Sequence, residues 1–385
     1  MSVTAPRGFL AAGVAAGIRA GGGPDLALVV NEGPDHAAAG VFTRNQVKAA
    51  PVLWSAQVLT GSRLRAVALN AGGANACTGP AGFQDTHATA ERVAKVLDCG
   101  AIEVAVCSTG LIGERLPLGA VLAGIDTAAA ALAATPEAGL AAATAVLTTD
   151  TVPKQAAVSA AGWTVGGFAK GAGMVAPSLA TMLSVLTTDA LVDGSTLDAV
   201  LREAATATFE RLDVDGSCST NDTVLLLASG ASGVRPERER FAAAVRQVCY
   251  ELVRGLQADA EGVTKEVTIT VRGAVSDAEA LAAARAVARD NLVKTAFFGS
   301  DPNWGRIAAA VGAAPATVRA DALDIRINDV LLCQGGTRVA DRSRADLSGR
   351  DIRVEVELHL GGGEATVLTT DLSHGYVDEN SAYSS

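Results

Sequence analysis

A loop of small residues that leads directly into an apolar strand, near the middle of the chain, constrains the fold most. Residues 170–183 read KGAGMVAPSLATML, with glycine and alanine in the first half and Pro177 as an interruption. The segment 181–187 (TMLSVLT) is apolar and β-branched, and we expect it to form a buried strand. The junction therefore predicts a tight loop that delivers the hydroxyl of Thr181 at the end of a buried strand.

A threonine hydroxyl at such a point can act as a nucleophile when a base stands beside it. The nearest base that a chain can supply is the threonine's own α-amine, which is freed when the preceding peptide bond is cut. Because an α-amine has an unperturbed pKa of about 8, a useful fraction is unprotonated at neutral pH. A cut between Ala180 and Thr181 would supply this base. The plainer interpretation of the same pattern is an ordinary turn before a strand.

Length, charge and cysteine spacing limit the class of protein. With 385 residues we expect two lobes or one large layered body. A net charge of −10 argues against nucleic acid or an anionic membrane as the main partner. The chain has no secretory pattern at its start, no uninterrupted apolar run of about 18 residues and six cysteines without a CxxC pair, which favours a cytoplasmic protein with reduced thiols. No metal site is predicted, because Asp213, Asp215, Asp222 and Asp301 fit no EF-hand spacing and are interpreted as cap and turn residues.

Apolar runs alternate with helical patterns, which predicts a mixed α/β chain with an antiparallel C-terminal part. No linker is long enough to separate independent domains. One expected helix, opened by Pro236, carries an apolar stripe of Phe241, Val245, Val248 and Leu252. Strands are expected over residues 26–30, 40–43, 64–69, 103–107, 267–271, 322–327, 352–359 and 365–369, and further helices over 86–97, 116–134, 195–211 and 276–292.

Residues 170–190 (KGAGMVAPSLATMLSVLTTDA) resemble the signature of the ornithine acetyltransferases, the glutamate N-acetyltransferases of arginine biosynthesis. The resemblance extends in order over nearly the whole chain. It includes the stretches 108–110 (STG), 148–150 (TTD), 213–216 (DVDG), 221–223 (NDT), 299–306 (GSDPNWGR) and 380–383 (NSAY).

The resemblance implies a role for each matching residue. Thr181 is expected to be the nucleophile, after self-cleavage between Ala180 and Thr181. Two chains of 180 and 205 residues result, residues 1–180 and 181–385, which stay together as one intertwined body. Thr109 and Gly110 are expected to stabilise the oxyanion. Substrate contacts are expected from Thr148, Lys170, Thr181, Glu261, Asn380 and the C-terminal Ser385, where family members typically end in threonine; Thr149 beside Thr148 leaves that register open.

The implied fold is a layered α/β sandwich similar to N-terminal-nucleophile hydrolases, with different strand connectivity. The implied reaction is acetyl transfer from N-acetyl-L-ornithine to L-glutamate through an acetyl-threonine ester, without a cofactor, in an α2β2 assembly. Some members also take acetyl from acetyl-CoA, and the sequence does not decide that point. Two alternatives stay open: an N-terminal-nucleophile aminopeptidase or amidohydrolase, in which water is the acceptor, and a non-enzymatic glycine-rich binding protein that keeps an intact chain.

Overall fold

The computed structural model describes residues 2–174 and 182–382. Within these residues the chain divides into two compact units. Unit 1 contains residues 2–210 and 217–259, and unit 2 contains residues 211–216 and 260–382. The predicted cut in front of Thr181 falls inside the range of unit 1, so it does not coincide with this division.

One sheet of unit 1 has four strands in the order β1-β2-β4-β5, of which only β4 and β5 run parallel. Four helices pack against it or along its edge. The strands are β1 (Phe9–Val14), β2 (Leu26–Asn31), β4 (Ala66–Asn70) and β5 (Val104–Ser108), and the helices are α1 (Ala50–Val58), α2 (Gly79–Leu97), α3 (Leu118–Ala130) and α4 (Pro136–Ala145).

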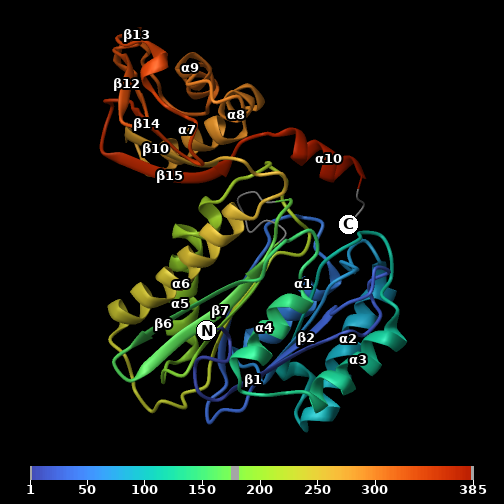
Figure 1. Cartoon of the computed structure of the whole chain (residues 1–385). Helices are drawn as coiled ribbons and strands as arrows, with labels where there is room; N and C mark the ends of the chain where they lie inside the picture. The colour runs from blue at the N-terminus through green and yellow to red at the C-terminus, as the bar shows by residue number, and fades with distance from the viewer. Residues whose placement is uncertain (1, 175–181, 383–385) are drawn as a thin grey trace. The chain divides into compact units, whose positions relative to one another are not determined.

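The second sheet of unit 1 has five strands in the order β3-β9-β8-β7-β6, with β8 and β9 parallel. Two helices cover its outer face (Figure 1). Because β8 and β9 follow residue 181 while β7 and β6 precede it, strands from both sides of the predicted cut pair in one sheet. The elements are β3 (Ala37–Phe42), β6 (Lys154–Ala160), β7 (Trp163–Lys170), β8 (Leu183–Thr188), β9 (Thr223–Ala228), α5 (Gly194–Ala207) and α6 (Arg238–Ala258).

The two sheets of unit 1 face each other across one apolar core. Phe168 and Val185 from the five-stranded sheet belong to the same buried cluster as Val29 and Leu69 from the four-stranded sheet. The layers therefore follow the order helix, sheet, sheet, helix (Figure 1). The layered α/β class predicted from the sequence is confirmed.

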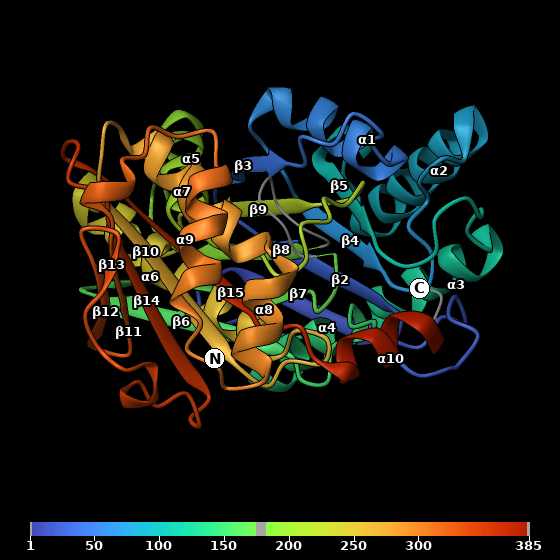
Figure 2. The same ribbon diagram turned by 90° about the horizontal axis from the view of Figure 1, so that it is seen from above.

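Unit 2 is built on a six-stranded sheet in the order β13-β12-β11-β14-β10-β15, in which β10 and β14 are parallel and the other pairs antiparallel. Helix α7 packs on β10 and β15, and α9 lies beside α7 (Figure 2). The elements are β10 (Glu266–Ala274), α7 (Asp277–Arg289), α8 (Asn291–Phe298), α9 (Trp304–Ala313), β11 (Asp324–Ile327), β12 (Val330–Gln334), β13 (Thr337–Arg338), β14 (Asp351–Glu357), β15 (Gly363–Thr370) and α10 (His374–Ala382).

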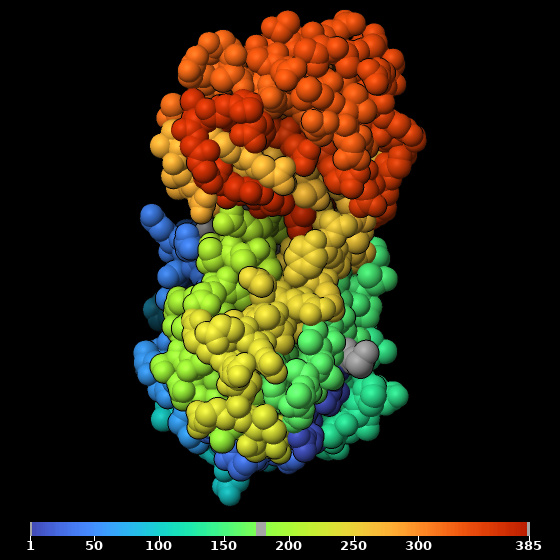
Figure 3. Space-filling view, turned by 90° about the vertical axis from the view of Figure 1, so that its left-hand side faces the viewer, coloured from blue at the N-terminus to red at the C-terminus, as the bar shows by residue number. Residues whose placement is uncertain are grey.

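Helix α6 has the apolar stripe that the sequence predicts. Phe241, Val245, Val248 and Leu252 are all buried, whereas Tyr250 on the other side is half exposed. That outer side forms part of the surface of unit 1 in Figure 3, where α6 is yellow. No helix among the described residues is long and apolar enough to cross a membrane.

Two predicted helices were too long, for reasons of capping. The helix expected over 276–292 ends at Arg289, and Asp290 caps a new helix by accepting the Val293 N–H at 2.9 Å. The helix expected over 116–134 ends at Ala130, and Thr135 caps α4 by accepting the Ala138 N–H at 3.2 Å. In the first case the cap residue lies inside the predicted segment and begins a new helix there, and in the second it follows the segment and begins the next helix.

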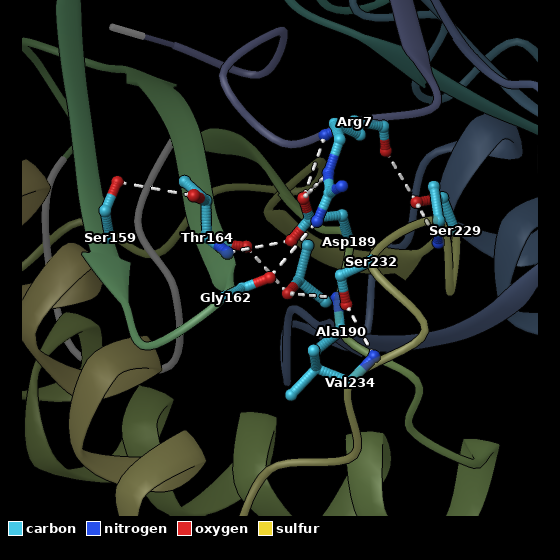
Figure 4. A network of polar contacts seen from close by, with 11 residues as sticks. Arg7, Ser159, Gly162, Thr164, Asp189, Ala190, Ser229, Ser232 and Val234 are labelled. Atoms are coloured by element: carbon cyan, nitrogen blue, oxygen red, sulfur yellow. Dashed lines mark hydrogen bonds and ion pairs between the residues drawn. The ribbon is translucent and has the colours of Figure 1, made fainter.

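The N-terminal segment is attached to the end of the five-stranded sheet at which β7 begins and β8 finishes (Figure 4). The carboxylate of Asp189 accepts the Thr164 N–H at 2.8 Å, the Arg7 N–H at 3.2 Å and the Arg7 Nε–H at 3.1 Å. Ser229 Oγ donates to the Arg7 carbonyl at 2.6 Å. We call this group, Arg7, Thr164, Asp189 and Ser229, the N-terminal anchor.

Candidate active site

The candidate site lies at the opposite end of the five-stranded sheet of unit 1. Lys170 is the last residue of β7, and Leu183, the first residue of β8, lies directly opposite it in the strand pairing. The residues that follow β5, Thr109 and Gly110, reach this end from the other sheet. The fold therefore brings together the ends of strands that are far apart in the sequence.

Lys170 connects two of the predicted site residues through hydrogen bonds. Its side chain is 1% exposed, and its Nζ donates to Thr148 Oγ1 at 2.8 Å and to Thr109 Oγ1 at 3.2 Å. A threonine oxygen that accepts from an ammonium keeps its own O–H free to donate elsewhere. Lys170 thus leaves the Thr109 hydroxyl able to donate a hydrogen bond to an acceptor in the site.

A buried network of opposite charges stands behind Lys170. The Asp150 carboxylate accepts the Lys154 Nζ–H at 2.6 Å and the Gly171 N–H at 2.7 Å, and it lies 3.7 Å from Lys170 Nζ. Lys154 also contacts Asp259 at 2.5 Å. Burial alone would raise the pKa of Asp150, but the ammonium groups of Lys170 and Lys154 lower it to about 2. Asp150 is therefore a carboxylate at neutral pH.

The backbone conformation at Gly110 requires glycine. Its φ is +127°, and a Cβ atom there would lie 2.6 Å from both Gly72 C and Gly73 N. The Thr109 N–H donates to the Asn70 carbonyl at 3.0 Å, which fixes the loop after β5 on the loop after β4. A larger residue at 110 would have to displace this pair of loops.

Asn221 and Asp222 lie just before β9, at the same end of the five-stranded sheet. Asn221 Nδ2 donates to the carbonyls of Ala74 and Ser108 at 2.6 and 2.8 Å. Asp222 Oδ1 accepts the Met182 N–H at 3.0 Å, and burial raises the pKa of Asp222 well above its usual value. The interpretation of Asp222 as a cap or turn residue was wrong, because this carboxyl is buried and holds the start of β8. For Asp213 the interpretation fits, since its Oδ1 accepts the Gly216 N–H of a turn at 3.2 Å.

Two further predicted site residues lie in unit 2 and contact each other. Asn380 Nδ2, on α10, donates to Glu261 Oε2 at 2.8 Å. Gly262, next to Glu261, has a φ of +62°, and a Cβ there would lie 2.0 Å from Tyr376 N. Only glycine thus lets α10 approach the segment that carries Glu261 this closely.

The predicted site residues that the structure describes fall into two groups, one in each unit. Thr109, Gly110, Thr148 and Lys170 lie together in unit 1, and Glu261 and Asn380 lie together in unit 2. Of Thr148 and Thr149, between which the sequence left the register open, Thr148 is the one whose hydroxyl accepts from Lys170 Nζ. Ala180, Thr181 and Ser385 are outside the described residues. In residues 2–174 and 182–382 no cluster of His, Cys, Asp and Glu has the make-up of a metal site, and the six cysteines are free.

Three residues of this network were not predicted from the sequence as parts of the site: Lys154, Asp150 and Asp259. Asp150 stood inside the quoted stretch 148–150, so a signal for it was present. Lys154 and Asp259 are 105 positions apart, and only the pairing of β6 with β7 and the end of α6 bring them together.

Comparison with known proteins finds one family over nearly the whole chain. The model of the family described as "ArgJ family" matches residues 10–385. The "Arginine biosynthesis bifunctional protein ArgJ" of Mycolicibacterium paratuberculosis is 64% identical over 389 residues, which cover 100% of this chain and 96% of that protein. The protein of the same name from Thermobifida fusca is 56% identical over 384 residues, with both chains fully covered.

Among solved structures, the chain is similar to the ornithine acetyltransferase of Mycobacterium tuberculosis, which was solved in complex with ornithine. The identity is 67%, the match covers 46% of this chain and 95% of that chain, and the TM-score is 0.46.

Proposed function

The chain belongs to the ArgJ family, and from this premise we propose that it transfers the acetyl group of N-acetyl-L-ornithine to L-glutamate after cutting itself between Ala180 and Thr181. Family membership makes it an acyltransferase of arginine biosynthesis. The proposal concerns the donor, the acceptor, the nucleophile and the residues that serve it.

The observation that carries the proposal is the contact of the buried Lys170 ammonium with the hydroxyls of Thr109 and Thr148. Acyl transfer needs preorganised donors where negative charge develops on the carbonyl oxygen, and each such donor is worth about 3–4 kcal/mol. The Thr109 O–H and the Gly110 N–H are the donors in this proposal. Met182, the residue after the proposed nucleophile, lies at the same end of the sheet, where its N–H donates to Asp222.

The first half of the proposed reaction forms an ester. Thr181 Oγ attacks the acetyl carbonyl, and the α-amine of Thr181 takes the hydroxyl proton. Thr109 and Gly110 hold the oxyanion of the tetrahedral intermediate. The same amine then gives the proton to the departing nitrogen, so that ornithine leaves and the acetyl group stays on Thr181.

The second half reverses these steps with a new amine. Glutamate enters the pocket, its α-amine attacks the acetyl-threonine ester, and N-acetylglutamate leaves with the Thr181 hydroxyl restored. Both substrates are α-amino acids with one further polar end, so one set of contacts can serve both. In the proposal, Thr148 and Lys170 contact substrate, Glu261 pairs with an ornithine ammonium, and Asn380 and Ser385 add the last contacts.

Three further parts of the proposal concern the assembly and its conditions. The fragments 1–180 and 181–385 remain associated as α2β2, the reaction takes place in the cytoplasm without a cofactor, and acetyl-CoA is an additional donor to test.

The first test is the state of the purified chain. A denaturing gel with mass spectrometry should show two fragments of about 18 and 21 kDa in place of 38.7 kDa, the second beginning with Thr181. An active protein that consists of intact chain alone would refute the mechanism.

The second test separates transfer from hydrolysis. With labelled N-acetylornithine, label should appear in N-acetylglutamate only when glutamate is present, and free acetate should stay a minor product. Release of acetate at a rate that ignores glutamate would instead identify an N-terminal-nucleophile amidohydrolase. A parallel reaction with acetyl-CoA as the sole donor decides whether it is used.

A further inference from the structure

The Asp150 carboxylate lies between two ammonium groups, and it holds them unequally. Lys154 Nζ contacts Asp150 Oδ1 at 2.6 Å, whereas Lys170 Nζ is 3.7 Å from Oδ2. All three side chains are at most 2% exposed. Water therefore screens these charges little, and the nearest protein charges decide where each ammonium settles.

The Asp150 carboxylate also accepts two backbone hydrogen bonds. Oδ1 accepts the Gly171 N–H at 2.7 Å in addition to Lys154, and Oδ2 accepts the Thr148 N–H at 3.2 Å. Gly171 and Thr148 belong to the segments that carry Lys170 and its hydroxyl partner. Asp150 thus fixes both the backbone of the site and the charge behind it.

Lys154 is held in turn from its other side. It contacts Asp259, whose carboxylate also accepts the backbone N–H groups of Thr151 and Val152 at 3.0 and 3.3 Å. Two carboxylates therefore share Lys154. This arrangement keeps its ammonium between them and beside Asp150.

We propose that Lys154 and Asp150 are positioning residues for Lys170: Lys154 occupies the Asp150 carboxylate so closely that the Lys170 ammonium stays on the hydroxyls of Thr109 and Thr148. Without Lys154, Asp150 would lose its nearer cation, and the ammonium left to compensate the buried carboxylate is Lys170, which now lies 3.7 Å away. Lys170 would then leave the oxyanion donor Thr109. This inference rests on the proposed function, because it assigns residues to the same reaction.

The experiment compares four variants of the full chain. Lys154→Met removes the competing ammonium at similar volume, Lys154→Arg keeps the positive charge as a guanidinium, and Asp150→Asn removes the carboxylate charge. The fourth variant combines Asp150→Asn with Lys154→Met. A matched control is Lys265→Met in unit 2, where the ammonium of a buried lysine donates to the carbonyls of Leu347, Ser348 and Gly349, at 2.7, 3.0 and 2.9 Å. Activity is expressed per mole of cleaved chain, counted from a denaturing gel.

The expected effects follow from the direction in which Lys170 moves. Lys154→Met should lower kcat/KM about 100-fold, and Lys154→Arg should restore most of it. The double variant should be no worse than Asp150→Asn alone, since a neutral residue 150 no longer attracts Lys170. The control should keep its kcat/KM.

The alkaline limb of the pH–rate profile provides a readout that a general loss of packing does not change. Among residues 2–174 and 182–382, the charged groups with a known contact to Lys170 or to its partner are Asp150 and, behind it, Lys154 and Asp259. In Lys154→Met the Lys170 ammonium has Asp150 to itself and keeps its proton to higher pH, so the limb should rise by about one pH unit. In Asp150→Asn the limb should fall, because the neighbouring anion is gone.

Losses that multiply in the double variant, or alkaline limbs that do not move in opposite directions, would overturn the inference. Failure of the proposed function looks different. In that case the wild-type protein itself would show no glutamate-dependent transfer. If the wild type transfers acetyl but the Lys154 and Asp150 variants behave like the Lys265→Met control, the positioning role is refuted and the proposed function is not.

Discussion

The five-stranded sheet of unit 1 has a charge cluster at each end, and the two clusters are built differently. In the N-terminal anchor, one buried carboxylate, Asp189, is matched by two backbone N–H groups and by Arg7, whose side chain is 62% exposed. At the candidate site, Lys154, Lys170, Asp150 and Asp259 are all buried, none more than 8% exposed. One cluster keeps its cation in water, and the other removes two cations from it.

The difference in burial of the cations suits two different tasks: attachment of a segment at one end of the sheet and the proposed chemistry at the other. Burying an ion pair costs desolvation free energy that its attraction often does not recover, so a fold that needs only an attachment point can use an exposed cation. Two buried lysines next to threonine hydroxyls are an expensive way to hold a sheet together. They fit the proposed function, in which they supply a preorganised positive field for a reacting carbonyl. Substitutions at the two ends should therefore affect different properties.

The largest effect is expected from Thr181→Ala, at the proposed nucleophile. The proposed mechanism needs this hydroxyl for both the self-cut and the acetyl ester, so the chain should stay at 38.7 kDa and lose transfer by at least about 10⁴-fold. A gel and a transfer assay on the same sample measure both. A Thr181→Ala protein that is cut and active would remove the basis of the comparison.

Gly110→Ala should follow, because the added Cβ meets the backbone of Gly72 and Gly73 at 2.6 Å. Displacement of the loop that carries the proposed oxyanion donors, Thr109 and Gly110, should cost about 10²–10³ in kcat. Gly113→Ala is the matched control, since Gly113 also has a positive φ, of +93°, but has no atom within 4 Å of its added Cβ. Equal losses in both variants would show that backbone strain alone is responsible.

Much of this end could be predicted from the sequence, and its charge network could not. Thr109, Thr148 and Lys170 each follow or end a segment with a clear pattern, and a resemblance supplied their roles. Lys154 pairs with Asp259 only because β6 lies beside β7 and α6 ends next to both, and neither spacing nor charge pattern encodes that. Asp222 was misinterpreted for the same reason: its partner, the Met182 N–H, is set by strand pairing and not by local turn chemistry.

At the N-terminal anchor, Asp189→Ala should lower stability and leave activity unchanged, the reverse of what is expected at the candidate site. The N–H groups of Arg7 and Thr164 lose a charged acceptor, which should lower the free energy of unfolding by about 2–4 kcal/mol. Cutting and kcat/KM of the folded protein should not change. Urea unfolding and the transfer assay check the two halves, and a large loss of kcat/KM at full folding would show that the ends are coupled.

The acid stability of the site end offers a finer test. The folded-state pKa of Asp150 is about 2, below its ordinary value of 3.8, so its contribution is fully present above pH 4 and is lost as pH falls through 2. That difference corresponds to about 2–3 kcal/mol. Asp150→Asn should therefore be less stable than wild type at pH 6, and the gap in urea midpoint should close between pH 4 and pH 2. A gap that is independent of pH would mean that Asp150 stabilises through shape and not through charge.

The smallest effect is expected from Arg7→Ala, at the exposed half of the anchor. The substitution removes the Nε–H bond to Asp189 and the bond from Nη2 to the Gly162 carbonyl at 3.1 Å, but it leaves the backbone N–H of residue 7 on the same carboxylate. Because the guanidinium is mostly in water, its ion pair is worth less than about 1 kcal/mol. The unfolding midpoint should shift slightly at low salt and less at high salt, where screening removes what the pair contributes. A loss as large as that of Asp189→Ala would instead place the energy of the anchor in the exposed cation, and the contrast between the two ends of the sheet would no longer hold.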